Sequence, residues 1–303
     1  MNTLIGIEIG GTKLQLVAGD GAGGIIDRQR LEVDKSRGGA GIREQIAQGL
    51  PRLIANYQPT AIGVGFGGPV DHGTGRIAKS HQIEGWSEFE LGEWLHEQTG
   101  LPVRVDNDAN VAAFGEALAG AGRETNPVFY VTLGSGVGGG LVVDGRIYHG
   151  AKPGESELGH VRLDRSGTLV EERCAGWAVD RQIREAVAGE PGSKLRQLIG
   201  SETRGEARFL AGAVEAGDPL ATRLLESTAE DLAFGLSHVT QLMHPATIIL
   251  GGGLSLVGEP LRAAVGRHLR RFIMEVFGEG PEVRLAALGE DAVPVGALLL
   301  AAG

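Results

Sequence analysis

Residues 4–18 read LIGIEIGGTKLQLVA, and this stretch decides the fold. An apolar run over Leu4–Glu8 is interrupted by Gly10-Gly11-Thr12-Lys13 and resumes over Leu14–Ala18, which predicts a strand, a tight turn and a second strand. Glycines let backbone N–H groups approach anionic oxygens because no Cβ stands in the way. The turn is therefore a candidate phosphate loop, although a plain hairpin turn explains the same residues.

A second unit of this kind follows about 120 residues later. Val128–Leu133 enters the turn Gly134-Ser135-Gly136-Val137-Gly138, and Gly139–Val143 leaves it. The formal G-x-G-x-x-G match does not predict a dinucleotide site, because that fingerprint opens a helix and here a strand continues. A phosphate-binding hairpin and a plain β-turn both remain open. The repetition predicts two similar α/β lobes with a nucleotide between them.

Helical spacing predicts a helix over Gly41–Tyr57, with a kink or restart at Pro51. Another helix, Ala109–Gly120, follows the short strand Val103–Val105. Further elements are expected after Gly176, namely helices over Asp180–Ala188, Gly205–Ala216 and Asp218–Met243, a strand Thr247–Leu250 that ends in Gly251-Gly252-Gly253, and a last helix, Val293–Ala302, that returns to the first lobe.

Composition narrows the class of protein. The 303 residues are 42% hydrophobic and 22% charged, which is enough for two compact lobes. The 51 glycines lie between apolar runs, so we expect tight turns and close backbone approaches. A net charge of −10 with scattered Lys and Arg gives no basic stripe, which excludes nucleic acid as an expected partner.

The single cysteine, Cys174, excludes an internal disulfide and a multi-cysteine zinc site, and makes a reducing cytoplasm the expected location. The longest apolar stretch, Ala292–Gly303, is shorter than the ~20 residues of a membrane span. The N-terminus lacks the basic region of a signal peptide. We therefore expect a soluble protein with no membrane partner.

Short polar side chains crowd the start of the helix at Ala109, in the stretch Asp106-Asn107-Asp108-Ala109-Asn110. Helix capping explains one of them, because one cap needs one residue. The surplus predicts a site in which Asn107 holds a hydroxyl and Asp108 accepts its proton, as phosphoryl transfer to an alcohol requires.

A second polar segment, Glu155-Ser156-Glu157-Leu158-Gly159-His160, combines carboxylates with an imidazole. Such groups bind vicinal hydroxyls through paired hydrogen bonds, and a solvated loop explains them equally well. A metal site is not expected, because His149 and His160 alone are too few ligands.

Taken in order, these segments resemble the ROK family of bacterial sugar kinases and sugar-responsive repressors over nearly the whole chain. The resemblance is carried by the two candidate phosphate loops, the Asn-Asp pair, the E-x-G-H segment and an adenosine-side loop, which are Glu8–Lys13, Leu133–Gly140, Asn107-Asp108, Glu157–His160 and Leu250–Gly253.

The resemblance implies a two-lobed α/β fold of the actin-like ATPase (ribonuclease H-like) class, with a nucleotide and sugar cleft between the lobes. Its lobes are expected at residues 1–118 plus 291–303 and at residues 119–290. It also implies a homodimeric, cytoplasmic hexose kinase that uses Mg-ATP and phosphorylates the 6-hydroxyl, with glucose as the expected sugar and Asp108 as the catalytic base.

The resemblance to the ROK family implies a set of site residues at the matching positions of this chain. The expected sugar-binding residues are Gly68, Asn107, Asp108, Glu157, His160 and Glu171. The expected nucleotide-binding residues are Gly10, Gly11, Thr12, Lys13, Gly134, Ser135, Gly136, Gly252 and Gly253. Glu8 is the expected contact to the water shell of Mg²⁺.

The chain departs from the family pattern at three places. Glu8 stands where Asp is usual, which moves the carboxylate by roughly 1 Å. Residues 161–170 contain no Cys, so we predict no structural zinc and a segment held by packing alone. At the sugar, Ala175 replaces a Ser and Gln82 an Asn, which leaves the sugar preference open.

Alternative functions also stay open. N-acetylmannosamine, N-acetylglucosamine or fructose could replace glucose as substrate. Repressor function is disfavoured, because the first strand begins near Leu4 and leaves no room for an N-terminal helix-turn-helix. A sugar-binding protein without catalysis would be distinguished from a kinase by hexose-dependent ATP turnover.

Overall fold

The computed structural model describes residues 2–78, 83–152 and 156–303. The chain divides into two compact units, which we describe separately. Unit 1 comprises Met1–Glu124, Gly140–Ser156 and Ala287–Gly303, and unit 2 comprises Thr125–Gly139 and Glu157–Ala286. The predicted lobes, 1–118 plus 291–303 and 119–290, stay a prediction; the two divisions differ mainly over Gly140–Ser156.

Unit 1 is built around a mixed sheet. The strands of the whole unit, inside and outside this sheet, are β1 (Leu4–Ile9), β2 (Lys13–Gly19), β3 (Ile25–Glu32), β4 (Ile62–Phe66), β5 (Val70–Asp71), β6 (Arg76–Ile77), β7 (Val103–Asn107) and β10 (Arg146–Ile147). Its helices are η1 (Lys35–Arg37), α1 (Gly38–Tyr57), α2 (Leu91–Thr99), α3 (Asp108–Ala119), η6 (Gly289–Asp291) and α10 (Ala292–Ala302).

Unit 2 is richer in helix. Its strands are β8 (Val128–Leu133), β11 (Thr247–Gly251) and β12 (Glu282–Leu285), and β9 (Val137–Val143) begins in it. Its helices are η2 (Leu158–His160), α4 (Val170–Cys174), α5 (Gly176–Gly189), α6 (Lys194–Ile199), η3 (Glu206–Phe209), α7 (Leu210–Glu215), α8 (Pro219–Met243), η4 (Gly253–Val257), α9 (Glu259–Phe272) and η5 (Glu275–Phe277).

The two five-stranded sheets repeat one strand order. The first runs β3-β2-β1-β4-β7, and the second runs β10-β9-β8-β11-β12. In the first, β1 is antiparallel to β2 and parallel to β4; in the second, β8 is parallel to β11. Each predicted strand, glycine turn and strand is present, so the predicted repetition is confirmed.

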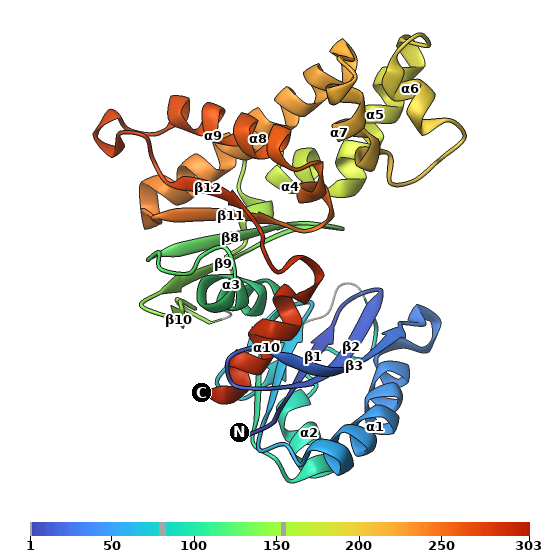
Figure 1. Ribbon diagram of the computed structural model, residues 1–303, viewed down its shortest axis with the longest axis vertical. Coiled ribbons are helices and arrows are strands. Elements are labelled where there is room, and N and C mark those ends of the chain that lie inside the picture. The colour runs from blue at the N-terminus through green and yellow to red at the C-terminus, as the bar shows by residue number, and fades with distance from the viewer. Residues whose placement is uncertain (1, 79–82, 153–155) are drawn as a thin grey trace. The chain divides into compact units, whose positions relative to one another are not determined.

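The sheet of unit 1 is buried on both faces because its central strand alternates. Ile5 and Ile7 belong to the core cluster that contains Ile42 and Ile46 of α1. Gly6, between them, faces α10 on the other side of the sheet. In Figure 1, α1 and α2 lie along one side of this sheet, and α10 lies along the other.

Glycine allows α10 to approach its neighbours backbone to backbone. A Cβ built on Gly63 of β4 would lie 1.9 Å from the carbonyl oxygen of Ala297. A Cβ on Gly296 would lie 1.9 Å from the carbonyl oxygen of Val111 in α3. Any larger residue at either position would force the backbones apart. Close backbone approach thus explains part of the high glycine content.

Some elements differ from the expectations. Helix α1 does not restart at Pro51 but continues through it to Tyr57, because Ile46, Leu50 and Leu53 keep one apolar face buried on both sides of the proline. The sequence patterns did not predict β3, α2 or α9. In the described part of the chain, no helix is both long and apolar enough to cross a membrane.

We expect Gly63→Ala to destabilise the protein by about 1–3 kcal/mol or more, because the new Cβ overlaps the backbone of α10. Gly189→Ala is the matched control, since a Cβ at that helix end meets nothing within 4 Å. Denaturant-induced unfolding of both variants measures the difference. Equal stability of the two variants would contradict the close approach of α10.

Candidate functional site

The first glycine turn lies beside Asp108 within unit 1. The backbone N–H of Gly10 donates to the carbonyl of Lys13 at 2.9 Å and closes the turn. The N–H of Gly67 donates to the carbonyl of Ile9 at 2.8 Å. A Cβ on Gly67 would lie 3.3 Å from Asp108 Oδ2 and 3.6 Å from Gly10 Cα. The predicted loop and the predicted base are therefore neighbours.

Asn107, not Asp108, caps helix α3. Asn107 Oδ1 accepts hydrogen bonds from the N–H groups of Ala109 at 2.9 Å and Asn110 at 3.2 Å. Its Nδ2 donates to the carbonyl of Gly68 at 3.2 Å. Because Asn107 performs the capping, the carboxylate of Asp108 is not needed for it. Asp108 stands in the first turn of the helix, where the helix dipole stabilises negative charge.

This arrangement restricts how Asn107 can bind a ligand. Its amide oxygen is engaged by the helix, and one of its two amide hydrogens is engaged by Gly68. The second amide hydrogen is the group with which Asn107 would meet a sugar hydroxyl.

Glu8 is held by two side chains next to the first turn. Its carboxylate is 13% exposed, accepts a hydrogen bond from Gln15 Nε2 at 2.6 Å, and lies 3.4 Å from Lys13 Nζ. Burial raises the pKa of Glu8 above its usual value, opposed by the positive charge of Lys13 and by the Gln15 hydrogen bond. The oxygen donors of Glu8 are the type that Mg²⁺ prefers.

Gln15 holds Glu8 from the neighbouring strand, a contact that the sequence patterns did not predict. Gln15 is fully buried, and its Oε1 accepts hydrogen bonds from Arg28 at 3.3 Å and Arg30 at 3.2 Å. The signal was present in the predicted hairpin, because Gln15 lies directly opposite Glu8 in the β1–β2 register. A polar residue opposite another in an apolar hairpin indicates a pair.

In unit 2, the second glycine turn is fixed by neighbouring segments. Its Gly134 carbonyl accepts from the N–H of Gly176 at 2.8 Å. The N–H of Val137 donates to Glu171 Oε2 at 2.9 Å, and a Cβ on Gly136 would lie 2.7 Å from that oxygen. Glu171 therefore shapes the turn itself, in addition to its predicted contact with sugar.

Two other predicted segments adjoin the same turn. Gly252 has a φ of +78°, and a Cβ on it would lie 2.6 Å from the backbone nitrogen of Leu133. A Cβ on Gly159, within the E-x-G-H segment, would lie 2.3 Å from the carbonyl oxygen of Val137. The segments Gly252–Gly253 and Glu157–His160 thus gather around the second turn, with Ser135 exposed at its tip.

The prediction that residues 161–170 are held by packing alone is wrong. The N–H of Leu163 donates to the carbonyl of Thr168 at 2.8 Å. Asp164 Oδ1 accepts from Ser166 Oγ at 2.6 Å and from the N–H of Gly167 at 2.9 Å, and these hydrogen bonds hold the pKa of Asp164 below its usual value. A short polar side chain that bonds its own turn supplies this order.

Metal-ligand chemistry is sparse in the described residues. They contain no group of three or more His, Cys, Asp and Glu side chains that could hold a metal ion. Cys174 is buried, and burial raises the pKa of its thiol. Ala175, which replaces the usual Ser of the family, is also fully buried. Gln82 and Glu155 lie outside the described residues.

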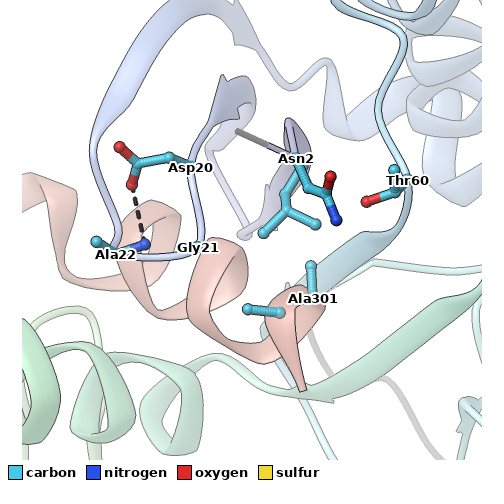
Figure 2. A pocket seen from close by; sticks show the side chains of 8 residues that line it. Asn2, Asp20, Gly21, Ala22, Thr60 and Ala301 are labelled. Carbon is cyan, nitrogen blue, oxygen red and sulfur yellow. Dashed lines mark hydrogen bonds between the residues drawn. The ribbon is translucent and has the colours of Figure 1, made fainter.

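A surface pocket of about 460 Å³ lies in unit 1, between the start of β1 and the end of α10 (Figure 2). Its one carboxylate, Asp20, accepts hydrogen bonds from the N–H groups of Ala22 at 2.9 Å and Gly24 at 2.8 Å. Because those bonds close the β2–β3 turn, Asp20 has a structural role. The pocket contains none of the predicted site residues.

Comparison with known proteins agrees with the motif order. The sequence model of the ROK family matches residues 4–303. The chain belongs to the ROK family. A ROK relative named glucokinase, from Halalkalibacterium halodurans, is 32% identical over 306 residues, which cover 96% of this chain and 92% of that protein.

Solved ROK structures share the fold. A glucokinase from Streptomyces griseus in complex with glucose and AMPPNP is 29% identical, with a TM-score of 0.84 and 99% coverage of both chains. A hexokinase from Thermus thermophilus is 31% identical, with a TM-score of 0.80 and coverage of 99% of this chain and 97% of that one. The actin-like ATPase fold predicted for this ROK chain is therefore confirmed.

We expect purified protein to contain well under one equivalent of zinc, because the 161–170 segment of this ROK protein closes through its own hydrogen bonds. Elemental analysis by mass spectrometry, after dialysis into metal-free buffer, measures the content. About one equivalent of zinc that survives dialysis would contradict the prediction.

Proposed function

We propose that this protein transfers the γ-phosphoryl group of ATP to the 6-hydroxyl of a hexose, with glucose as the preferred sugar. That the chain is a sugar kinase follows from its full-length match to ROK glucokinases. The observation that carries the mechanism is the position of Asp108, which lies beside the first glycine turn and is not used as the helix cap.

Asp108 is the proposed base. Its carboxylate accepts the proton of the sugar hydroxyl as that oxygen attacks phosphorus. A base at the start of a helix is held rigidly, because its backbone is fixed by the Asn107 cap and by the first turn of α3. Asn107 supports the same hydroxyl group through its remaining amide hydrogen.

The glycine turns are the proposed phosphate contacts. These turns comprise Gly10, Gly11, Thr12 and Lys13 in unit 1, and Gly134, Ser135 and Gly136 in unit 2. The N–H groups of Gly10 and Gly134 close the turns on the carbonyls of Lys13 and Gly136. The N–H groups of the other turn residues are therefore the proposed phosphate donors. Gly252 and Gly253 are proposed for the adenosine side, since Gly252 packs against Leu133 at the start of the second turn and Gly253 follows it in the chain. The amine of Lys13 adds a positive charge beside the first turn.

Glu8 is the proposed carboxylate for Mg²⁺, in keeping with its hard oxygen donors. Gln15 fixes one of its oxygens, and Lys13 lies near the other. When bound, the cation would neutralise charge on the phosphate oxygens. For the sugar, Glu157, His160, Glu171 and Gly68 are the proposed further contacts. A homodimer in the cytoplasm is proposed on the family resemblance, and light scattering tests the dimer.

Hexose-dependent release of ADP tests the function directly. We expect Mg·ATP turnover to be highest with glucose among glucose, fructose, N-acetylglucosamine and N-acetylmannosamine, because full-length relatives are named glucokinases. A coupled ADP assay across these sugars gives the ranking. Turnover that favours another sugar would revise the substrate, and turnover that never depends on sugar would favour a binding protein.

We expect Asp108→Asn to fold normally and to lose at least about 10²-fold in kcat, because the amide cannot accept the hydroxyl proton. Glu97→Gln is the control, because it also removes one negative charge, at an exposed position in α2. It should keep wild-type kcat. Thermal unfolding shows whether either variant is misfolded. Retention of most activity in Asp108→Asn would remove Asp108 from the role of base.

A further inference from the structure

A buried carboxylate lies directly before the predicted sugar-binding pair. Asp106, at the end of β7, is 3% exposed. Its Oδ1 accepts hydrogen bonds from the backbone N–H of Asn107 at 2.8 Å and from Asn110 Nδ2 at 3.0 Å. Because these bonds reach residues on both sides of Asp108, the orientation of the Asp106 carboxylate sets the backbone that carries the proposed base.

The second oxygen of this carboxylate is held by a residue from a distant part of the sequence. His149, which follows β10, places its Nε2 2.6 Å from Asp106 Oδ2. A carboxylate only accepts hydrogen bonds, so the Nε2–H of His149 is the donor. Hydrogen bonds of this length to a buried charged acceptor are among the strong ones. Without this donor, Asp106 Oδ2 would lose a partner in a buried position.

The ring of His149 is itself fixed by a second histidine. The ring of His72, in the turn between β5 and β6, stacks on it with 3.6 Å between ring centroids and 9° between planes. Burial, and then the nearby His149, lowers the pKa of His72, which favours the neutral form of the His72 ring. Two flat rings in this arrangement restrict each other's rotation.

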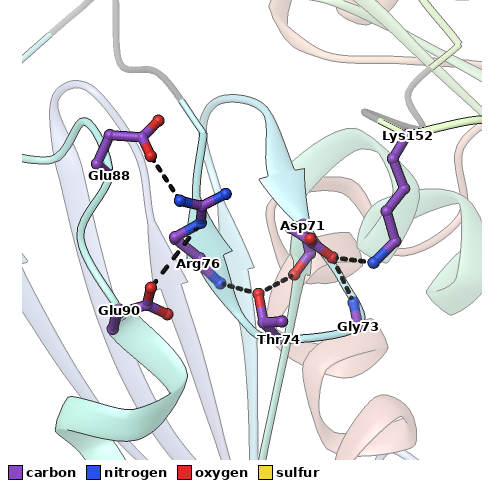
Figure 3. Close-up of polar contacts among 7 residues, drawn as sticks. All are labelled: Asp71, Gly73, Thr74, Arg76, Glu88, Glu90 and Lys152. Atoms are coloured by element: carbon purple, nitrogen blue, oxygen red, sulfur yellow. Dashed lines mark hydrogen bonds and ion pairs between the residues drawn. The ribbon is translucent and has the colours of Figure 1, made fainter.

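An ion pair joins the same two segments at a second point. The Asp71 carboxylate, next to His72, pairs with Lys152 Nζ and accepts from the N–H of Gly73 at 3.0 Å (Figure 3). In the same view, Arg76 of β6 pairs with Glu88 at 2.6 Å, which fastens the other side of the β5–β6 hairpin. The turn with His72 is therefore held firmly against the segment with His149.

We propose that His149 is a positioning residue for phosphoryl transfer, which acts by donating its Nε2–H to Asp106 and thereby orients Asn107 and Asp108. The proposal rests on the proposed function of Asp108. His149 does not touch the reacting atoms; its effect passes through Asp106 to the start of α3. A displacement of about 1 Å at a catalytic group costs about 10²-fold in rate, so the loss of this bond is measurable.

The test compares two replacements that differ in the donor. His149→Leu fills similar space without an N–H, whereas His149→Gln carries an amide N–H near the position of Nε2. We expect kcat with glucose to fall about 10-fold or more in His149→Leu and to recover to within about 3-fold of wild type in His149→Gln. The KM for Mg·ATP should stay unchanged in both. His96→Leu, an exposed histidine of α2, is the control.

Asp106→Asn examines the same bond from the acceptor side. We expect a kcat loss comparable to that of His149→Leu, and no further loss when the two changes are combined, because both remove one interaction. If His149→Leu does not fold, the kcat values of His149→Gln and Asp106→Asn are compared instead, and they still measure the contribution of the hydrogen bond to kcat. A hydrogen-bonded Nε2–H proton resonance of His149, seen in wild type and lost in Asp106→Asn, reports the bond without any activity.

Two results would overturn the positioning role. One is a His149→Leu variant with wild-type kcat. The other is a His149→Gln variant as slow as His149→Leu, because ring volume and not the donor would then matter. A wild-type protein with no hexose-dependent turnover would instead contradict the proposed function, and the Nε2–H resonance would still decide whether His149 holds Asp106.

Discussion

The contact of α10 with β4 and α3 is the constraint on which unit 1 depends. At Gly63 and Gly296, carbonyl oxygens of neighbouring elements occupy the space where a Cβ would stand. The backbones are thereby locked at a distance that no other residue type permits. Helix α3 is fixed by this contact, and α3 carries Asp108 at its first position. The position of the proposed base therefore depends on Gly63 and Gly296, which are far from Asp108 in the sequence.

The start of α3 shows how polar roles are divided among adjacent residues. Asn107 caps the helix, Asp106 binds the backbone and side chain around the cap, and Asp108 is the proposed base. A cluster of short polar residues at a helix start has a surplus over the needs of capping. In this protein, two residues are not needed for capping. Asp106 has a structural role, and Asp108 has the proposed catalytic role.

The second sheet repeats the strand order of the first, and its glycine turn has additional contacts that hold it. In unit 1, the first turn is closed by its own Gly10–Lys13 bond and lies against Gly67. In unit 2, the second turn is also closed by its own Gly134–Gly136 bond, and Glu171 of α4 and the N–H of Gly176 hold it further. The two turns thus share an internal closing bond and differ in the neighbouring segments that hold them.

The sequence by itself determined the repeated hairpins, the strand-to-helix junction at Asp108 and the ordered motifs of the ROK family, because apolar periodicity and glycine turns are local signals. Only the tertiary structure decided which residues support the site. The hydrogen bond of His149 to Asp106 is a contact between individual side chains that no periodicity encodes. His149 lies 43 positions from Asp106 in sequence, so their hydrogen bond exists only once β7 and the segment after β10 are folded together.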